Sequence, residues 1–181
     1  MPRPSTAARR YAEAVFEIAD RDGTLDRWTA DLRLVADVVA EEDVARVVDS
    51  PAIPYDARRE VLAKLLEPRI SPPAFHLTLL LAQRGRLSSV PAVAAEYKRL
   101  VDRERGIVVA TVTSAIRLEP AELEAIGARV REMTGARPEI AAAVDPDLIG
   151  GVTVRIGDRL IDASVRGRLE RLRDRIVAGA R

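Results

Sequence analysis

The sequence contains no cysteine and only one histidine, His76. Without cysteine there can be no disulfide, no thiolate metal site and no cysteine nucleophile, and the chain is expected to be intracellular. A single histidine also excludes a multi-histidine metal site. Aromatic residues make up only 3% of the chain. The core must therefore consist mainly of Leu, Val, Ile and Ala, which suits closely packed helices.

Long apolar runs are also missing. No stretch approaches the roughly 20 apolar residues of a membrane-spanning helix, and the N-terminus lacks the continuous apolar segment of a signal peptide. We therefore expect no direct membrane insertion. The chain also has no large excess of charge of either sign. It contains 29 Lys and Arg and 28 Asp and Glu, which gives a net charge of +1. This balance disfavours a nucleic-acid binder, an alternative that salt-dependent DNA binding would revive.

Apolar residues recur at helical spacing through the first 105 residues, and the turn residues between them predict six helices. The expected helices cover about 6–20, 25–39, 44–49, 54–67, 72–84 and 90–105. Thr24 is expected to cap the second helix, and Ser71 with Pro72 to begin the fifth.

Two of these helices carry more apolar surface than a single packing contact needs. The first has one apolar stripe at Ala8, Ala12, Val15 and Ala19 and a second at Ala7, Tyr11, Ala14 and Ile18. The fifth contains residues 74–82, AFHLTLLLA, which include no charged residue. The first helix is therefore either central or forms a groove, and the fifth is a second candidate for lining one. His76 would be a packed or groove-lining residue rather than a ligand.

The hydrophobic period changes at Gly106. Residues 107–115 and 137–144 read as strands, with a helix from Pro120 between them. Val152 to Ile156 alternate as a half-buried strand does, Gly157-Asp158 is a hairpin turn, and Asp162 or Ser164 can cap a last helix. The predicted fold is mainly α: an N-terminal six-helix bundle (1–105) followed by a small α+β C-terminal domain (106–181).

The sequence contains no clear motif for catalysis or for binding a metal or cofactor. The glycines match no phosphate-binding motif. Asp145 and Asp147 resemble the start of a calcium loop but lack its remaining ligands, so turn capping is favoured. Asp158 and Asp162 could be paired carboxylates, yet no partner base accompanies them, and capping again explains them better. We predict no catalytic residue, no metal site and no cofactor.

Four segments carry a family resemblance. They are ARRYAEAVFEIA (8–19), SPAIPYDARREVLAKLL (50–66), AQRGRLSSVPAV (82–93) and DLIGGVTVRIGDRLIDASVRGRLERL (147–172). Together they resemble the delta subunit of F-type ATP synthases, the bacterial counterpart of OSCP, and the last segment is the most specific.

The resemblance implies a non-catalytic stator subunit at the cytoplasmic face of the bacterial cell membrane, present in one copy per complex. Its N-terminal bundle would receive the N-terminal helix of an alpha subunit, and its C-terminal domain would hold the peripheral stalk of b subunits. The implied alpha-helix groove consists of Ala7, Tyr11, Ala14, Ile18, Leu77, Leu80 and Leu81. The family's C-terminal signature, mostly architectural, maps onto Gly150, Gly151, Arg155, Gly157, Asp158, Asp162, Ser164, Arg166 and Leu169.

Other interpretations stay open on the residues alone. A generic helical adaptor would use the same groove for a different helix. An enzyme would need a polar pocket with a positioned nucleophile or metal, which the sequence does not show. Arg168, Arg171 and Arg175 share one face of the last helix, and they could either meet an acidic partner or be solvated.

Overall fold

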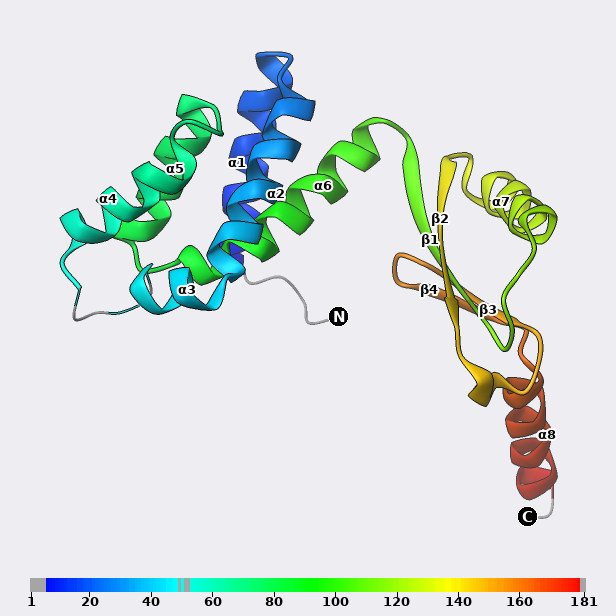
Figure 1. Ribbon diagram of the computed structural model, residues 1–181. Coiled ribbons are helices and arrows are strands. Elements are labelled where there is room, and N and C mark those ends of the chain that lie inside the picture. Colours follow the sequence, from blue (N-terminus) through cyan, green and yellow to red (C-terminus); the bar gives the residue numbers. More distant parts are fainter. Residues whose placement is uncertain (1–5, 49, 51–52, 180–181) are drawn as a thin grey trace. The chain divides into compact units, whose positions relative to one another are not determined.

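The computed structural model describes residues 6–48, 50 and 53–179 (Figure 1). The chain divides into two compact units, Met1–Val101 and Asp102–Arg181. Each unit has its own hydrophobic core. The chain is mostly helical with an α+β C-terminal part, as predicted, and the sheet in that part has four strands. None of the described helices is both long and apolar enough to cross a membrane.

The first unit is built from helices. They are α1 (Thr6–Arg21), α2 (Leu25–Ala40), α3 (Glu42–Val48), α4 (Tyr55–Leu66), α5 (Pro72–Gln83), the short η1 (Leu87–Ser89) and α6 (Val90–Glu104). Tyr97 of α6 is completely buried, and its ring meets Phe16 of α1 edge-on with centroids 6.4 Å apart. The Tyr97 hydroxyl donates a hydrogen bond to the Leu25 carbonyl at 3.1 Å. One aromatic side chain thus ties three helices together, which matters in a core with few aromatics.

The start of α5 depends on a residue that the sequence did not point to. Neither Thr24 nor Ser71 makes a side-chain cap. The capping prediction for Thr24 is therefore wrong, whereas Ser71 and Pro72 begin α5 as predicted, although the Ser71 side chain does not cap it. Instead, the Ser71 backbone N–H donates to a carboxylate oxygen of Asp31 in α2, at 3.0 Å. Asp31 is only 3% exposed and also pairs with Arg27 at 3.1 Å. A buried carboxylate from another helix therefore satisfies the N-terminus of α5 and ties it to α2.

Replacing Asp31 with alanine should lower the free energy of unfolding of this unit by about 1–3 kcal/mol, because the α5 N-terminus loses its acceptor in a buried site. Trp28, the only tryptophan, is buried in the same helix and reports denaturant unfolding by fluorescence. Asp37→Ala removes an exposed carboxylate from α2 and should change stability by less than about 0.5 kcal/mol. Equal effects of the two substitutions would contradict the capping role.

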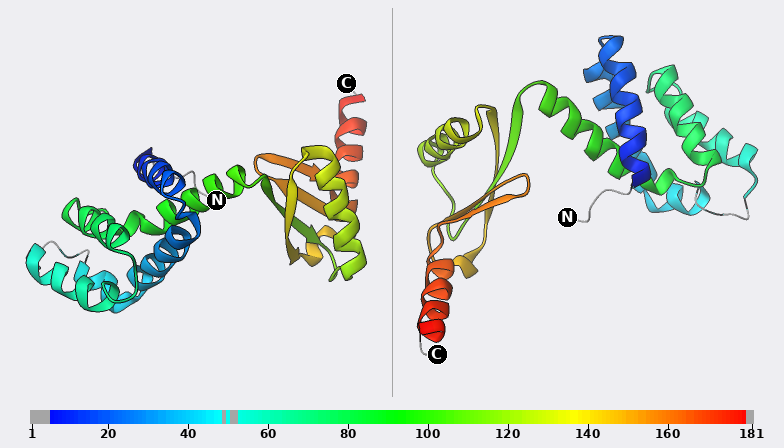
Figure 2. Two further views of the ribbon diagram at one scale, coloured as in Figure 1. Left: turned by 90° about the horizontal axis from the view of Figure 1, so that it is seen from above. Right: turned by 180° about the vertical axis from the view of Figure 1, so that it is seen from behind.

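The second unit combines a sheet with two helices (Figures 1 and 2). Its elements are β1 (Ile107–Ser114), α7 (Pro120–Thr134), β2 (Arg137–Val144), the short η2 (Pro146–Leu148), β3 (Val152–Ile156), β4 (Arg159–Asp162) and α8 (Val165–Gly179). The strand order is β2-β1-β3-β4. β1 and β2 are parallel and joined through α7, whereas β1 with β3 and β3 with β4 are antiparallel.

The core of this unit lies between α7 and one face of the sheet. Val112 of β1 stands opposite Ala142 of β2 and Val154 of β3. The buried side chains are Ala110, Val112, Val130, Val154 and Ile156. The alternating burial of β3 agrees with the half-buried strand predicted from its period of two. Of the α8 side chains that the structure describes, residues 165–177, none belongs to this core, although the spacing of the helix is amphipathic.

Candidate partner-binding surface

α1 buries one of its two apolar stripes and leaves the other accessible. Ala8, Ala12, Val15 and Ala19 are all at most 3% exposed and form part of the core. In the second stripe, Ala7 and Tyr11 are half-buried and Ala14 and Ile18 are exposed, Ile18 by 42%. The helix therefore presents apolar surface to the outside after its packing within the unit is complete.

α5 also divides into a buried and an accessible face. Ala74, Phe75, Thr78, Leu81 and Ala82 are buried. Leu77 is half-buried and Leu80 is 42% exposed. Leu81 was predicted to line the groove, but at 1% exposure it belongs to the core. Successive helix residues point about 100° apart, so Leu80 and Leu81 cannot share the same accessible surface.

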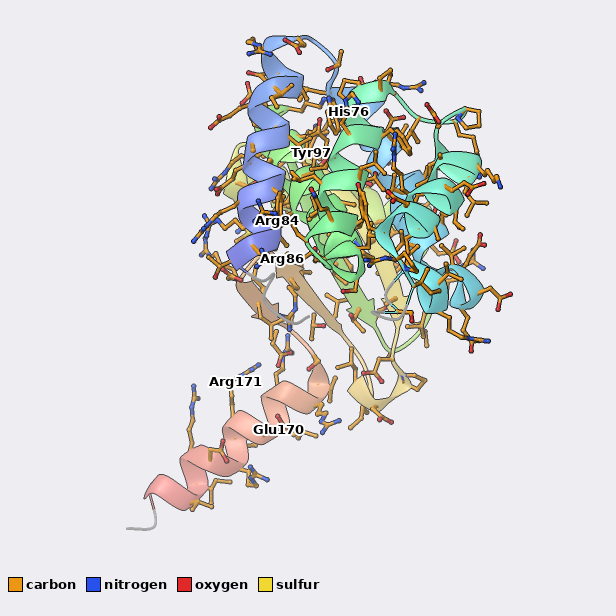
Figure 3. The ribbon with its side chains drawn as sticks, turned by 90° about the vertical axis from the view of Figure 1, so that its left-hand side faces the viewer. His76, Arg84, Arg86, Tyr97, Glu170 and Arg171 are labelled. Carbon is orange, nitrogen blue, oxygen red and sulfur yellow. The ribbon has the colours of Figure 1, made fainter. Side chains whose placement is uncertain are left out.

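α1 and α5 lie alongside each other in the first unit, with Tyr97 visible between them (Figure 3). A surface pocket of about 480 Å³ lies along the first half of α1, lined by Thr6, Ala7, Arg10, Tyr11, Ala14 and Arg86. Three of the predicted groove residues thus line one depression. Figure 3 places Arg84 and Arg86 near this end of the helix pair and His76 near the opposite end of α5.

Arg10 and Arg86 were missed as part of this surface. Arg10 lies three residues after Ala7 and four before Ala14, so helical spacing alone could have placed it on the same stripe. Arg86 follows the helix end and reaches the pocket only through the tertiary fold. The pocket thus combines apolar side chains of α1 with two cationic side chains. These residues and the accessible Ile18, Leu77 and Leu80, which lie outside the pocket, make up the candidate surface. We call it the α1/α5 surface: Ala7, Arg10, Tyr11, Ala14, Ile18, Leu77, Leu80 and Arg86.

The C-terminal signature residues form the connection between β3, β4 and α8. Gly151 has φ of +75°, and a Cβ atom there would lie 2.5 Å from the Ala163 carbonyl oxygen. The Gly150 carbonyl accepts a hydrogen bond from Val165 N–H at 2.9 Å, and Ala163 N–H donates to the Val152 carbonyl at 3.0 Å. These residues are needed because two backbone segments approach closely. We refer to this region, residues 150–152 with 162–167, as the α8 joint.

Asp162 and Ser164 hold the first turn of α8. Ser164 is 1% exposed, and its hydroxyl accepts from the Gly167 N–H at 3.0 Å, so it caps the helix as predicted. Asp162 accepts hydrogen bonds from the Ser164 hydroxyl at 2.7 Å and from its N–H at 2.9 Å. Arg171 approaches the same carboxylate at 3.5 Å. A Cβ atom on Gly167 would overlap this carboxylate, so a larger residue there would force the Asp162 side chain away from its contacts.

These contacts explain why Asp162 is better read as a capping residue than as an acid or base. The hydrogen bonds from Ser164, supported by the charge of Arg171, hold the pKa of the Asp162 carboxyl below its ordinary value. Asp145 likewise accepts from the Asp147 N–H at 3.0 Å, in agreement with its predicted turn-capping role. No group of three His, Cys, Asp or Glu side chains that could hold a metal occurs among the described residues.

The α8 joint should loosen in acid. Because the pKa of Asp162 is lowered on folding, its contribution to stability is present above its ordinary pKa of about 3.9 and is lost as pH falls through the lower folded value. The Gly167 amide, which is bonded to Ser164, should shift in NMR spectra over that acidic range. In Asp162→Asn this titration should disappear, and its persistence would assign the transition to another group.

The remaining signature residues do not meet in one site. Gly157 supplies the positive φ of +56° in the β3–β4 hairpin. Arg155 and Asp158 are exposed, on β3 and in this turn. Arg166 pairs with Glu170 at 3.1 Å, and Leu169 is 54% exposed on α8. Four of the nine signature residues, Gly150, Gly151, Asp162 and Ser164, thus position α8, and the other five lie in the hairpin or on exposed surface.

Comparison with known proteins agrees with this arrangement. The family model described as ATP synthase delta (OSCP) subunit matches residues 7–176. The chain belongs to this family. It is 38% identical over 172 residues to the ATP synthase subunit delta of Thioalkalivibrio sulfidiphilus, covering 95% of this chain and 97% of that one. It is also 37% identical over 177 residues to the corresponding subunit of Oleidesulfovibrio alaskensis, covering 96% and 97%.

The fold is also found in a solved structure. A chain in the Toxoplasma gondii mitochondrial ATP synthase hexamer matches with a TM-score of 0.74 and 21% identity, covering 96% of this chain and 98% of that one. As a delta (OSCP) family member, the protein is a non-catalytic stator component of F-type ATP synthase. Its sites should therefore be understood as surfaces for holding other proteins.

Proposed function

We propose that the first unit acts as a six-helix bundle that receives the N-terminal helix of an alpha subunit on the α1/α5 surface. The second unit contacts the peripheral stalk formed by the b subunits. One copy of the chain would join the two in each complex, at the cytoplasmic face of the bacterial cell membrane. The protein would thereby link the top of the catalytic hexamer to the stalk, so that rotor torque drives ATP synthesis instead of turning the hexamer.

The observation that carries this proposal is the second apolar stripe of α1. Ala14 and Ile18 remain exposed although the core of the unit is complete without them. Leu80 of α5 is exposed to the same degree as Ile18. An amphipathic helix laid against such a strip buries apolar side chains at i, i+3, i+4 and i+7 spacing, which is the usual way a helix is recognised in a groove.

The cationic end of the α1/α5 surface supports a defined direction of binding. Arg10 and Arg86 both line the pocket beside Ala7 and Tyr11. A helix carrying an acidic side chain at one end would place it there and leave its apolar residues for Ile18 and Leu80. Electrostatic complementarity of this kind sets orientation more than affinity.

Reconstitution tests the function as a whole. Membranes carrying the ATP synthase but depleted of this subunit should regain coupled ATP synthesis when the purified protein is added. A variant with Ala14 changed to aspartate should restore much less, because it still folds but cannot hold the alpha helix. If that variant restored ATP synthesis fully, the groove assignment would be wrong. If the unaltered protein restored none, the proposed function would be wrong.

A further inference from the structure

Four apolar side chains of α8 lie on one narrow line along the helix. Val165, Leu169, Leu172 and Ile176 are spaced by four, three and four residues and are 39%, 54%, 54% and 65% exposed. At 100° per residue they fall within an arc of about 60°. This spacing is that of the a and d positions of a heptad, with Leu169 and Ile176 at a. We call these four residues the α8 seam.

Every position that flanks the seam is an arginine. Arg166 and Arg173 occupy the e positions, and Arg168 and Arg175 occupy the g positions. Arg166 pairs with Glu170 at 3.1 Å and Arg173 with Asp174 at 2.9 Å. Within the part of the chain that the structure describes, Arg168 and Arg175 make no ion pair. The seam is thus bordered on both sides by positive charge, part of which has no counter-charge.

The α8 joint holds this seam in place. Gly150, Gly151, Asp162 and Ser164 connect the first turn of α8 to β3 and β4 by the contacts described above. The Arg171 guanidinium adds a hydrogen bond to the Asp162 carbonyl at 3.3 Å, and Figure 3 shows Arg171 and Glu170 on the ribbon of this helix. A helix that is capped and anchored at one end, yet leaves its apolar residues exposed, is prepared to pack against another surface.

We propose that the α8 seam packs along an amphipathic helix of another protein, one that carries apolar residues at a and d and Asp or Glu at e and g. Such a helix would pair with Arg168 and Arg175, which would otherwise lack a counter-charge. Two copies of α8 would bring arginines against arginines, so the same charges disfavour self-association. An amphipathic helix with Asp or Glu at e and g would therefore cover the apolar seam and also pair with the arginines that flank it.

A membrane surface fits these observations less well. Helices that lie in the bilayer interface have a wide apolar face, often with aromatic residues. The seam covers only about 60° of the helix, and residues 165–177 contain no aromatic side chain. In the assembled synthase this inference rests on the proposed stalk contact. It adds which residues make that contact and what charge the partner helix carries. Its test does not need the assembled enzyme.

Two synthetic peptides of four heptads provide the test on the full chain. Both have Leu at a and d, and one has Glu and the other Lys at e and g. The Glu peptide should bind at least about tenfold more tightly in calorimetry, with affinity falling as salt rises. The double change Arg168→Glu and Arg175→Glu should reverse this preference. Leu172→Asp should lower the affinity for the Glu peptide about tenfold or more.

Val177→Asp is the matched control, because Val177 is 62% exposed on the same helix but lies outside the seam. It should leave affinity within about twofold, and circular dichroism should show all variants folded. Equal binding of both peptides, or no reversal by the double change, would overturn the inference. The inference would also be overturned if the protein bound anionic phosphatidylglycerol vesicles more tightly than the Glu peptide. A dimer detected by sedimentation and lost in Leu172→Asp would overturn it as well. If the double change reverses the peptide preference but the protein fails to restore coupled ATP synthesis, the proposed function would be wrong and this inference would stand.

Discussion

Replacing Ala14 with aspartate is expected to reduce affinity for an alpha-subunit N-terminal peptide by about 100-fold, equivalent to about 2.7 kcal/mol. Ala14 lies in the middle of the accessible stripe and lines the pocket with Ala7 and Tyr11. A bound helix would cover this position, so the carboxylate would be desolvated without a partner. Hot-spot positions cluster near the centre of an interface, and changes there cost about 2 kcal/mol or more. Calorimetry with the peptide measures the effect directly.

Ala95→Asp provides the control for this experiment. Ala95 is also an exposed alanine inside a helix, in this case α6, and it is not among the residues that line the pocket. Both substitutions carry the same helix-propensity penalty, of at most about 0.7 kcal/mol. Trp28 fluorescence should show that both variants keep the folded first unit. If Ala14→Asp bound the peptide as tightly as Ala95→Asp does, the α1/α5 surface would not be the binding site.

Replacing Gly151 with alanine is expected to destabilise the second unit by about 2–5 kcal/mol. The positive φ costs an alanine about 1–2 kcal/mol, and the clash of its Cβ with the Ala163 backbone adds about 1–3 kcal/mol. A unit of this size has a total stability of only about 4–12 kcal/mol. Hydrogen exchange should therefore rise across β3, β4 and the start of α8. Trp28 fluorescence should not change, because the only tryptophan lies in the other unit.

Gly157→Ala separates the two contributions. Gly157 also has a positive φ, of +56°, but a Cβ atom there would have no neighbour within 4 Å. This substitution should cost only about 1–2 kcal/mol of backbone strain. The difference between the two variants therefore measures the close approach at the α8 joint. If both were equally mild, the joint would be more adaptable than its geometry indicates.

Much of the local structure follows from sequence pattern. The period of 3.6 located the helices, and the alternation from Val152 to Ile156 identified a strand that proved half-buried. Ser164 and Asp145 cap as their positions before a helix and a turn predict. These features depend on residues close together in the chain, so the physics that decides them is local.

Capping of α5 shows where local reasoning fails. Ser71 stands at the correct position for an N-cap, but Asp31, forty residues earlier, supplies the acceptor. No local pattern distinguishes Asp31 from Asp37 on the same helix, although one is buried and the other exposed. Likewise, Leu80 and Leu81 are indistinguishable in an uncharged run, and only packing decides that Leu81 enters the core.

The sequence by itself determined the family, the order of elements and the presence of surplus apolar surface on α1 and α5, because composition, periodicity and glycine positions are properties of the chain alone. Only the tertiary structure decided which side chains remain accessible. Arg86 joins Ala7 and Tyr11 in one pocket, and α8 leaves its seam outside the core of its unit. Accessibility depends on which long-range contacts a core completes, and a residue's immediate neighbours in sequence do not specify those contacts.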